Sequence, residues 1–279
     1  MTEKEFHDRF KIKFEPNYIQ QGDEVKLFTV AFNCQIPMIL KGPTGCGKTR
    51  FVELMAHRLG LPLVTVSCHE DLTAADLVGR FLFKDDQTVW QDGPLTLCVR
   101  YGGICYLDEI VEARKDTTVI IHSLTDDRRM LYVDKTGEVV RADPGFMMVL
   151  SYNPGYQSII KDLKQSTKQR FAGLVFDHPV PEVESRIIMS ETHLSQEESG
   201  RLAEMGSKLR ELKGFGLDEG VSTRLLVYVG RLMKAGLPAV EACSCAISQS
   251  LTDDAEIIDS IDSIVKLYFG ELGGRETES

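Results

Sequence analysis

Residues 38–51 read MILKGPTGCGKTRF, an apolar run followed by a glycine-rich loop, a lysine, a threonine and then helical spacing. The loop fits the pattern G-x-x-x-x-G-K-[ST], in which backbone N–H groups wrap around phosphate oxygens. This interpretation requires a strand before the loop and a helix after it, and residues 36–42 and 50–60 have the matching apolar patterns. The stretch therefore predicts a strand–loop–helix unit of an α/β fold, with a bound nucleotide.

The loop residues have distinct expected parts in holding a triphosphate. A helix that begins near Lys48 would present the positive end of its dipole to the phosphates. Lys48 is expected to reach the β- and γ-phosphates, and Thr49 is expected to supply a hydroxyl to Mg²⁺. The predicted ATP-binding residues are Gly42, Pro43, Thr44, Gly45, Cys46, Gly47, Lys48 and Thr49.

Further strands alternate with helical stretches after this loop. The additional segments with strand character are residues 61–68, 102–110, 144–155 and 171–179. They are nearly continuous apolar runs, which are typical of strands buried on both faces of a parallel sheet. We therefore expect the P-loop nucleoside triphosphatase fold, a five-stranded parallel α/β sheet with helices on both faces.

Two connections are longer than such a unit needs. Residues 80–95, RFLFKDDQTVWQDGPL, are expected to form a hairpin that turns at residues 85–87. Residues 129–145 are expected to form a second hairpin that turns at residues 135–137. Long ordered insertions in a compact domain are usually functional.

The pattern changes after residue 178, where two prolines precede a series of helices with no strand between them. The segments with helical spacing are residues 182–189, 196–212, 222–235, 239–250 and 254–269. We place a domain boundary near residue 183. Residues 1–183 would form the nucleotide-binding domain, residues 184–271 a helical lid, and residues 272–279 a frayed tail.

Two carboxylates and an amide follow buried strands. In ICYLDE, Asp108 is placed to hold Mg²⁺ through water, and Glu109 to polarise the attacking water. In VLSYNPG, Asn153 can hold the same water near the γ-phosphate. The alternatives are a strand that exits into a polar turn and an ordinary Asn-Pro turn. The P-loop upstream favours the functional interpretation, a Mg²⁺-dependent ATP hydrolase.

Four arginines are candidates for contacts with a nucleotide. Arg170 precedes the last expected strand, and Arg224 begins a helix of the second domain. Arg128 and Arg129 are expected to close a helix over residues 117–129. Each of the four could instead be a solvated surface side chain.

Composition limits the partners and the location. The net charge is −10, which argues against a nucleic-acid partner. No apolar run approaches the ~20 residues of a membrane span, and the charged start lacks the apolar core of a secretory signal. The 7 cysteines show no disulfide framework, which is typical of the cytoplasm. Cys243 and Cys245 are expected in the core on different helix faces, and the Cys-His-Glu at residues 68–70 lacks partners for zinc.

The motifs YLDE, SYNPG, QRF and GVSTR follow the P-loop in the order found in AAA+ ATPases of the MoxR class, which the chain resembles over nearly its whole length. The two hairpins also stand where that class has inserts, the first of them interrupting the second helix. The resemblance implies that Asn153 is sensor 1, that Arg170 is an arginine finger acting on a neighbouring subunit, and that Arg224 is sensor 2. Arg128 and Arg129 are reserve candidates for the contact in trans.

Longer blocks resemble the CbbQ/NorQ branch of this class, among them CHEDLTAADLVGRF, WQDGPLT and DLKQSTKQRFAGLVFD. The segment DEIVEAR, where many relatives have an Asn-Arg pair, agrees with this branch and leaves open which arginine acts in trans. The branch contains rubisco activators and nitric oxide reductase maturation factors. The resemblance therefore implies a homo-hexamer that uses ATP and Mg²⁺ on a protein client, with an adaptor carrying a von Willebrand factor A domain. Overall similarity favours rubisco as that client.

Three other functions share the P-loop. A small-molecule kinase would not need the carboxylate pair, a polar sensor or a helical lid. A DNA-translocating motor should carry basic pore loops and bind DNA with strong salt dependence. A non-catalytic nucleotide switch would not need Glu109.

Overall fold

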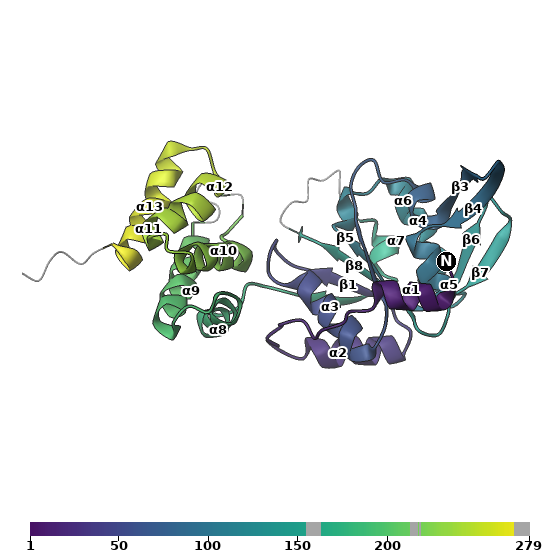
Figure 1. Ribbon diagram of the computed structural model, residues 1–279, viewed down its shortest axis with the longest axis horizontal. Helices are drawn as coiled ribbons and strands as arrows, with labels where there is room; N and C mark the ends of the chain where they lie inside the picture. Colours follow the sequence, from purple (N-terminus) through teal and green to yellow (C-terminus); the bar gives the residue numbers. More distant parts are fainter. Residues whose placement is uncertain (155–162, 213–216, 218, 271–279) are drawn as a thin grey trace, which may run out of the picture. The chain divides into compact units, whose positions relative to one another are not determined.

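The computed structural model describes residues 1–154, 163–212, 217 and 219–270 (Figure 1). Two compact units are formed, one by Met1–Gly42 with Gly47–Phe176 and one by Pro43–Cys46 with Asp177–Ser279. The division after Phe176 precedes the expected boundary near residue 183, because the extended residues after the last strand group with the helices. The tail predicted for residues 272–279 lies outside the described residues.

The first unit is built on a parallel sheet of five strands in the order β2-β5-β8-β1-β9. Their bounds are β1 (Met38–Lys41), β2 (Leu63–Ser67), β5 (Gly103–Asp108), β8 (Phe146–Tyr152) and β9 (Ala172–Val175). The predicted five-stranded parallel sheet is therefore confirmed. Because all five strands point the same way, the ends of β1, β5 and β8 meet at one edge of the sheet.

Alternating strand residues face two apolar layers. Ile39, Cys105 and Met148 join one buried cluster with side chains of α1, α4 and α5. Tyr106 points to the opposite face, where its hydroxyl lies 3.4 Å from Thr49 Oγ1 of α3. The helices of this unit are α1 (Glu3–Phe10), α2 (Glu24–Asn33), α3 (Lys48–Leu59), α4 (Ala74–Val78), α5 (Pro94–Tyr101), α6 (Lys115–Ile120) and α7 (Gln165–Lys168).

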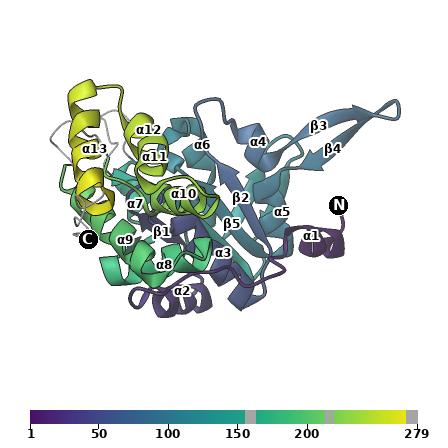
Figure 2. The ribbon, with the colours of Figure 1, turned by 60° about the vertical axis from the view of Figure 1, so that its left-hand side comes forward.

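Both predicted hairpins are present. β3 (Gly79–Lys84) pairs antiparallel with β4 (Gln87–Asp92), and β6 (Met130–Val133) pairs with β7 (Glu138–Arg141). The first hairpin lies between α4 and α5 and extends outward from the unit (Figure 2). The first insert therefore stands between two short helices of this unit, and that it interrupts the second helix of the class stays a prediction.

The helix expected over residues 117–129 is wrong in its second half. α6 ends at Ile120, and a short 3₁₀ turn over His122–Leu124 follows. The Asp126 carboxylate then accepts hydrogen bonds from the backbone N–H of Arg128 at 3.1 Å and from the guanidinium of the same residue. Such local bonds compete with helical ones, so Arg128 and Arg129 lie in a turn before β6.

Two N-terminal helices were not predicted, although the first carries a recognisable signal. Thr2 caps α1, its hydroxyl accepting from Glu5 N at 3.3 Å while the Glu5 carboxylate accepts from Thr2 N at 2.7 Å. This T-x-x-E capping box is readable in the sequence. Phe6 of α1 is fully buried against the sheet cluster, so the helix belongs to the core of the unit.

The second unit is helical, as predicted. Its helices are α8 (Pro181–Thr192), α9 (Gln196–Arg210), α10 (Thr223–Lys234), α11 (Ala239–Cys243), α12 (Gln249–Leu251) and α13 (Ala255–Phe269). A π-helical segment, Ser244–Ser248, interrupts the helix expected over residues 239–250. Cys243 is buried but Cys245 is exposed, so the expectation that both belong to the core is wrong for Cys245, which faces the other side of the helix. Within the described residues, no helix has the length and apolar character that crossing a membrane requires.

Candidate functional site

The P-loop joins β1 to α3 at the edge of the sheet where the strands end. Gly47 precedes α3 with a φ of 100°, a conformation that side chains with a Cβ rarely adopt. Lys48, the first residue of α3, is buried, and its Nζ donates to the carbonyl of Gly42 at 2.8 Å. The ammonium is thereby folded back onto Gly42, the residue with which the loop begins.

Gly45 lies at the tip of this loop, which belongs to the second unit, and has a φ of 71°. A Cβ at this position would stand 2.7 Å from Ser222 Cβ and 3.4 Å from Arg224 Cβ in the same unit. Thr44 Oγ1 donates to Glu219 of that unit at 3.3 Å. Any larger residue at position 45 would therefore force the loop or the start of α10 to shift.

Asp108 ends β5 and accepts two hydrogen bonds on one oxygen. Tyr106 donates its hydroxyl to Asp108 Oδ1 at 2.7 Å, and the Ser151 hydroxyl donates to the same atom. Since Thr49 lies 3.4 Å from the Tyr106 hydroxyl, the P-loop threonine and the carboxylate are joined through one tyrosine. A hydroxyl with a carboxylate is an oxygen donor set that suits Mg²⁺.

Tyr106 and Ser151 were not singled out in the sequence. Both are fully buried within strands, where a tyrosine is a common residue. Ser151 carried a weak signal, because it is a small polar residue directly after the apolar run FMMVL in the same strand. Burial beside Asp108 also raises the pKa of the Tyr106 hydroxyl well above its usual value, so it acts as a hydrogen-bond donor.

Glu109 has a strained backbone, with φ 53° and ψ 50°. Its N–H donates to Ser151 Oγ at 3.2 Å, which fixes the chain as it leaves β5. Burial raises the pKa of the Glu109 carboxyl above its ordinary value, Lys48 opposes this shift, and Asp108 adds to it. The carboxylate is thus partly desolvated beside a cation, as suits a group that accepts a proton from water.

Asn153 is buried directly after β8. β8 is the neighbour of β5 in the sheet, so Asn153 lies beside the end of β5. A hydrogen bond from the backbone N–H of Asn153 also lowers the pKa of the Glu109 carboxyl. Asp108, Glu109 and Asn153 are therefore brought together at one edge, as their positions after strands suggested.

Arg170 lies at the opposite edge of the sheet. It follows α7 and precedes β9, whose first residue Ala172 pairs with Met38 at the start of β1. β9 alone spans about 13 Å at ~3.3 Å per residue, so the side chain of Arg170 cannot reach the P-loop of its own subunit. Its Nε is buried without a hydrogen-bond partner among the described residues. The pKa of His122 is lowered, first by the burial of its ring and second by the positive charge of Arg170.

The two reserve arginines are engaged in different ways. Arg128 is exposed and forms an ion pair with Asp126 at 2.7 Å. Arg129 has a φ of 47° and donates to the carbonyls of Gln35 at 3.1 Å and Phe146 at 3.0 Å. These carbonyls stand before β1 and at the start of β8, so Arg129 ties the second hairpin to the sheet.

Arg224 lies in the first turn of α10, next to a cluster of buried polar side chains. Glu184 of α8 has no exposed surface and forms a bidentate ion pair with Arg210 of α9 at 2.8 and 2.5 Å. The Thr223 hydroxyl donates to Glu184 at 2.6 Å, and Arg210 Nε donates to the carbonyl of Val221 at 2.8 Å. The cluster fixes the first turn of α10, from which the exposed Arg224 projects.

Comparison with known proteins agrees with this arrangement. Residues 37–171 match the AAA domain of the dynein-related subfamily, and residues 184–268 match the C-terminal domain of CbbQ, NirQ and NorQ proteins. Protein CbbQ of Hydrogenophilus thermoluteolus is 56% identical over 265 residues, which cover 95% of this chain and 99% of that protein. The chain belongs to the CbbQ/NirQ/NorQ family. It is accordingly an AAA+ ATPase, as predicted from the P-loop and the carboxylate pair.

Other members of the CbbQ/NirQ/NorQ family are similar to nearly the same degree. Protein NorQ of Paracoccus denitrificans is 54% identical, covering 91% of this chain and 94% of its own length. The denitrification regulatory protein NirQ of Pseudomonas aeruginosa is 52% identical, with coverage of 91% and 97%. A RuvB mutant from Thermotoga maritima matches the fold with a TM-score of 0.55 at 13% identity, over 93% of this chain and 75% of that one.

Proposed function

We propose that this chain is the Mg²⁺-dependent motor subunit of a ring that remodels a protein client. The observation that carries the proposal is the Asp108 carboxylate, held by Tyr106 and Ser151 at the sheet edge where the P-loop begins. Lys48, which now donates to the carbonyl of Gly42, would bind β- and γ-phosphate oxygens. Thr49 and Asp108 would hold Mg²⁺, which would supply positive charge to the phosphate oxygens.

The polar groups beside these residues have separate parts in hydrolysis. Glu109 takes the proton of the attacking water, and its raised pKa and strained backbone support that role. Asn153 orients the same water from the end of β8. Arg224 of the lid contacts the γ-phosphate of its own subunit, which is supported by its position next to Gly45 within the second unit.

The family resemblance implies a homo-hexameric ring, and the position of Arg170 supports an assembly of this kind. Because Arg170 cannot reach the P-loop of its own subunit, any nucleotide that it contacts belongs to a neighbour. Arg129 is the weakest candidate for the contact in trans, since its guanidinium is held by backbone carbonyls.

The client proposed is rubisco blocked by a sugar phosphate, reached in the cytoplasm through an adaptor with a von Willebrand factor A domain. The similarity to CbbQ over 95% of the chain supports this assignment. Both hairpins also expose apolar side chains of a kind that protein interfaces use, including Phe83 at 75% exposure and Tyr132 at 45%. A second client, nitric oxide reductase, is favoured by the similarity to NorQ and NirQ.

Reconstitution tests the client. The purified chain, its adaptor, ATP and rubisco blocked by a sugar bisphosphate should regain carboxylation, and Glu109→Gln should abolish the recovery. If rubisco stays blocked while the same pair activates nitric oxide reductase assembled without its metal centre, the second client is correct. Transfer of the γ-phosphate to a small acceptor instead of water would contradict the motor and favour a kinase.

A further inference from the structure

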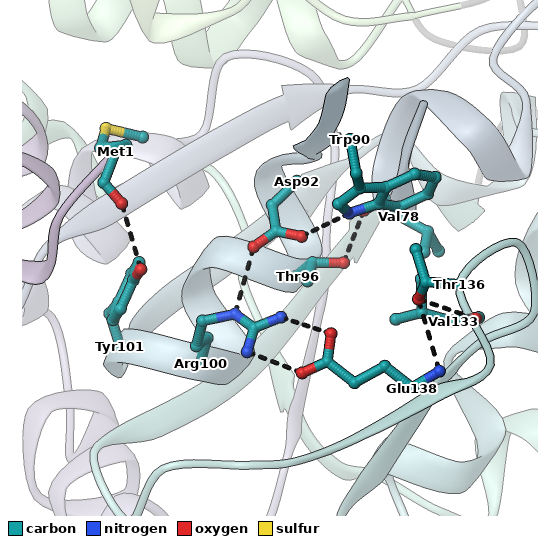
Figure 3. A network of polar contacts seen from close by, with 10 residues as sticks. All are labelled: Met1, Val78, Trp90, Asp92, Thr96, Arg100, Tyr101, Val133, Thr136 and Glu138. Carbon is teal, nitrogen blue, oxygen red and sulfur yellow. Dashed lines mark hydrogen bonds and ion pairs between the residues drawn. The ribbon is translucent and has the colours of Figure 1, made fainter. Parts of the chain in front are cut away.

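Helix α5 lies between the two inserted hairpins and carries a guanidinium that contacts both (Figure 3). The helix starts just after β4 ends at Asp92, and its residue Arg100 faces the start of β7 at Glu138. The two hairpins are far apart in the sequence. Arg100 therefore joins the base of the first hairpin, at Asp92, to the turn end of the second hairpin, at Glu138.

The geometry of this junction is specific to arginine. Arg100 Nε donates to Asp92 Oδ2 at 3.1 Å, while Nη1 and Nη2 donate to the two oxygens of Glu138 at 2.8 and 2.9 Å. One planar guanidinium thus serves two carboxylates, one of them in a bidentate pair. A lysine has one nitrogen and cannot reproduce both contacts.

The network continues onto the aromatic face of the first hairpin. Trp90 Nε1 donates to Asp92 Oδ1 at 2.7 Å, so Asp92 accepts from Trp90 and from Arg100 on different oxygens. Trp90 stands opposite Phe81 across the strands, and their rings meet edge to face at 5.1 Å. A series of hydrogen bonds therefore runs from the ring of Trp90 through Asp92 and Arg100 to the carboxylate of Glu138 on β7.

Both ends of the series are anchored locally. On the first side, Thr96 Oγ1 of α5 donates to the carbonyl of Val78 at 2.6 Å, just before β3 begins. On the second side, Glu138 N donates to Thr136 Oγ1 at 3.4 Å, within the turn that Thr136 closes on Val133. A displacement of the base of the first hairpin or of the turn end of the second would therefore strain the contacts of Arg100.

The contacts of Arg100 add to the support that the hairpins have. An isolated two-stranded hairpin is marginally stable in water, and each of these forms its own two-stranded sheet. The second hairpin already buries Leu131, Val133 and Val140 in the core cluster of the first unit. Both nevertheless present apolar side chains to solvent. The exposed residues are Phe81, Leu82, Phe83 and Val89 on the first hairpin and Tyr132 and Val139 on the second.

We propose that Arg100 is a positioning residue that braces the two inserted hairpins into one protein-contacting unit. The proposal deepens the proposed function and rests on it for the statement that the hairpins contact a protein partner. The brace lies apart from the nucleotide chemistry, because Arg100 precedes the start of β5 and Asp108 ends it, about 16 Å along the strand. Arg100 therefore acts on the partner contact and leaves the basal hydrolysis of ATP unchanged.

Hydrogen–deuterium exchange on the full chain tests the brace without any client. Arg100→Met should speed amide exchange roughly 3- to 10-fold in both hairpins. Glu138→Gln, which keeps the shape of an exposed side chain, should speed exchange in β3 and β4 as well as in β6 and β7. Arg141→Met removes the same charge from an exposed position of β7 and serves as the matched control.

Trp90 provides a second readout, because it is the only tryptophan of the chain. Quenching of its fluorescence by acrylamide should increase in Arg100→Met and Glu138→Gln, with Arg100→Lys between them and the parent. Recovery of the blocked client should fall in the same order at unchanged basal ATP hydrolysis. If the parent itself fails to activate any client, the proposed function is wrong, while exchange and quenching still decide the brace. Exchange that changes in one hairpin alone, or equally in Arg141→Met, would overturn the proposal.

Discussion

At the scale of a single residue, the conformation and the surroundings of Glu109 lower the stability of the fold. Its backbone is in the left-handed region, and its carboxylate is partly desolvated. Since the folded pKa lies above the unfolded value, the favourable contribution of this group is fully present below the unfolded pKa and is lost as the pH rises through the folded pKa. The ionised carboxylate, which the proposed role in hydrolysis needs, is therefore the form that lowers the free energy of unfolding.

Glu109→Gln is expected to bind ATP as the parent does and to lose hydrolysis by at least ~10²-fold, because the group that accepts the proton is gone. Without nucleotide and metal, the melting temperature of this variant should exceed that of the parent, and by more at about pH 8 than at about pH 5. Phosphate release, nucleotide binding and thermal scans measure the three quantities. Hydrolysis equal to that of the parent would remove Glu109 from its role.

The site was partly predictable from single residues. The P-loop and Asp108 were predicted from local patterns, because the loop follows a strand and Asp108 ends one, in a recognisable order. Tyr106 and Ser151 could not be found in this way. They act across neighbouring strands, on an oxygen whose place depends on the sheet register, and no spacing along the chain reveals that register.

At the scale of elements, the buried pair of Glu184 and Arg210 joins three helices of the lid. Glu184→Ala leaves the guanidinium of Arg210 buried without its carboxylate, which should cost about 3–5 kcal/mol of the free energy of unfolding. Glu197→Ala breaks the exposed pair with Arg201 in α9 and should cost less than about 1 kcal/mol. Denaturant unfolding of the two variants gives the comparison, and equal costs would contradict the structural role of the pair.

Arg129 should also act on stability and not on hydrolysis. Arg129→Ala removes hydrogen bonds from a charged donor to the carbonyls of Gln35 and Phe146. The expected cost is about 2 kcal/mol in the unfolding of the first unit, at unchanged ATP hydrolysis per folded ring. A loss of hydrolysis with no change in stability would instead make Arg129 the residue that acts in trans.

Elements with a regular period were predicted and those set by local side-chain chemistry were not. Both hairpins and the five strands follow from apolar patterns bounded by turn residues. The helix expected over residues 117–129 fails because Asp126 folds back on Arg128 N, a contact that apolar spacing does not register. The π-helical segment at Ser244–Ser248 was not predicted either, because the apolar spacing of its sequence is that of an ordinary helix.

At the scale of the whole molecule, the groups of the proposed reaction lie at two opposite edges of the sheet. Its strand ends carry Asp108, Glu109 and Asn153, and its other edge carries Arg170. In the ring that we propose, each subunit has every group for hydrolysis except one, and offers that one to another subunit. Arg170→Ala should therefore assemble and bind ATP normally, with turnover reduced by ~10³-fold or more.

Mixing two inactive variants tests the shared site most directly. Glu109→Gln subunits keep Arg170, and Arg170→Ala subunits keep Glu109, so a mixed ring contains interfaces at which both groups are intact. The account predicts that each variant alone is inactive and that their mixture, exchanged into common rings, hydrolyses ATP well above the sum of the two. A mixture that co-assembles and stays as inactive as its components would contradict the claim that Arg170 completes the site of a neighbour.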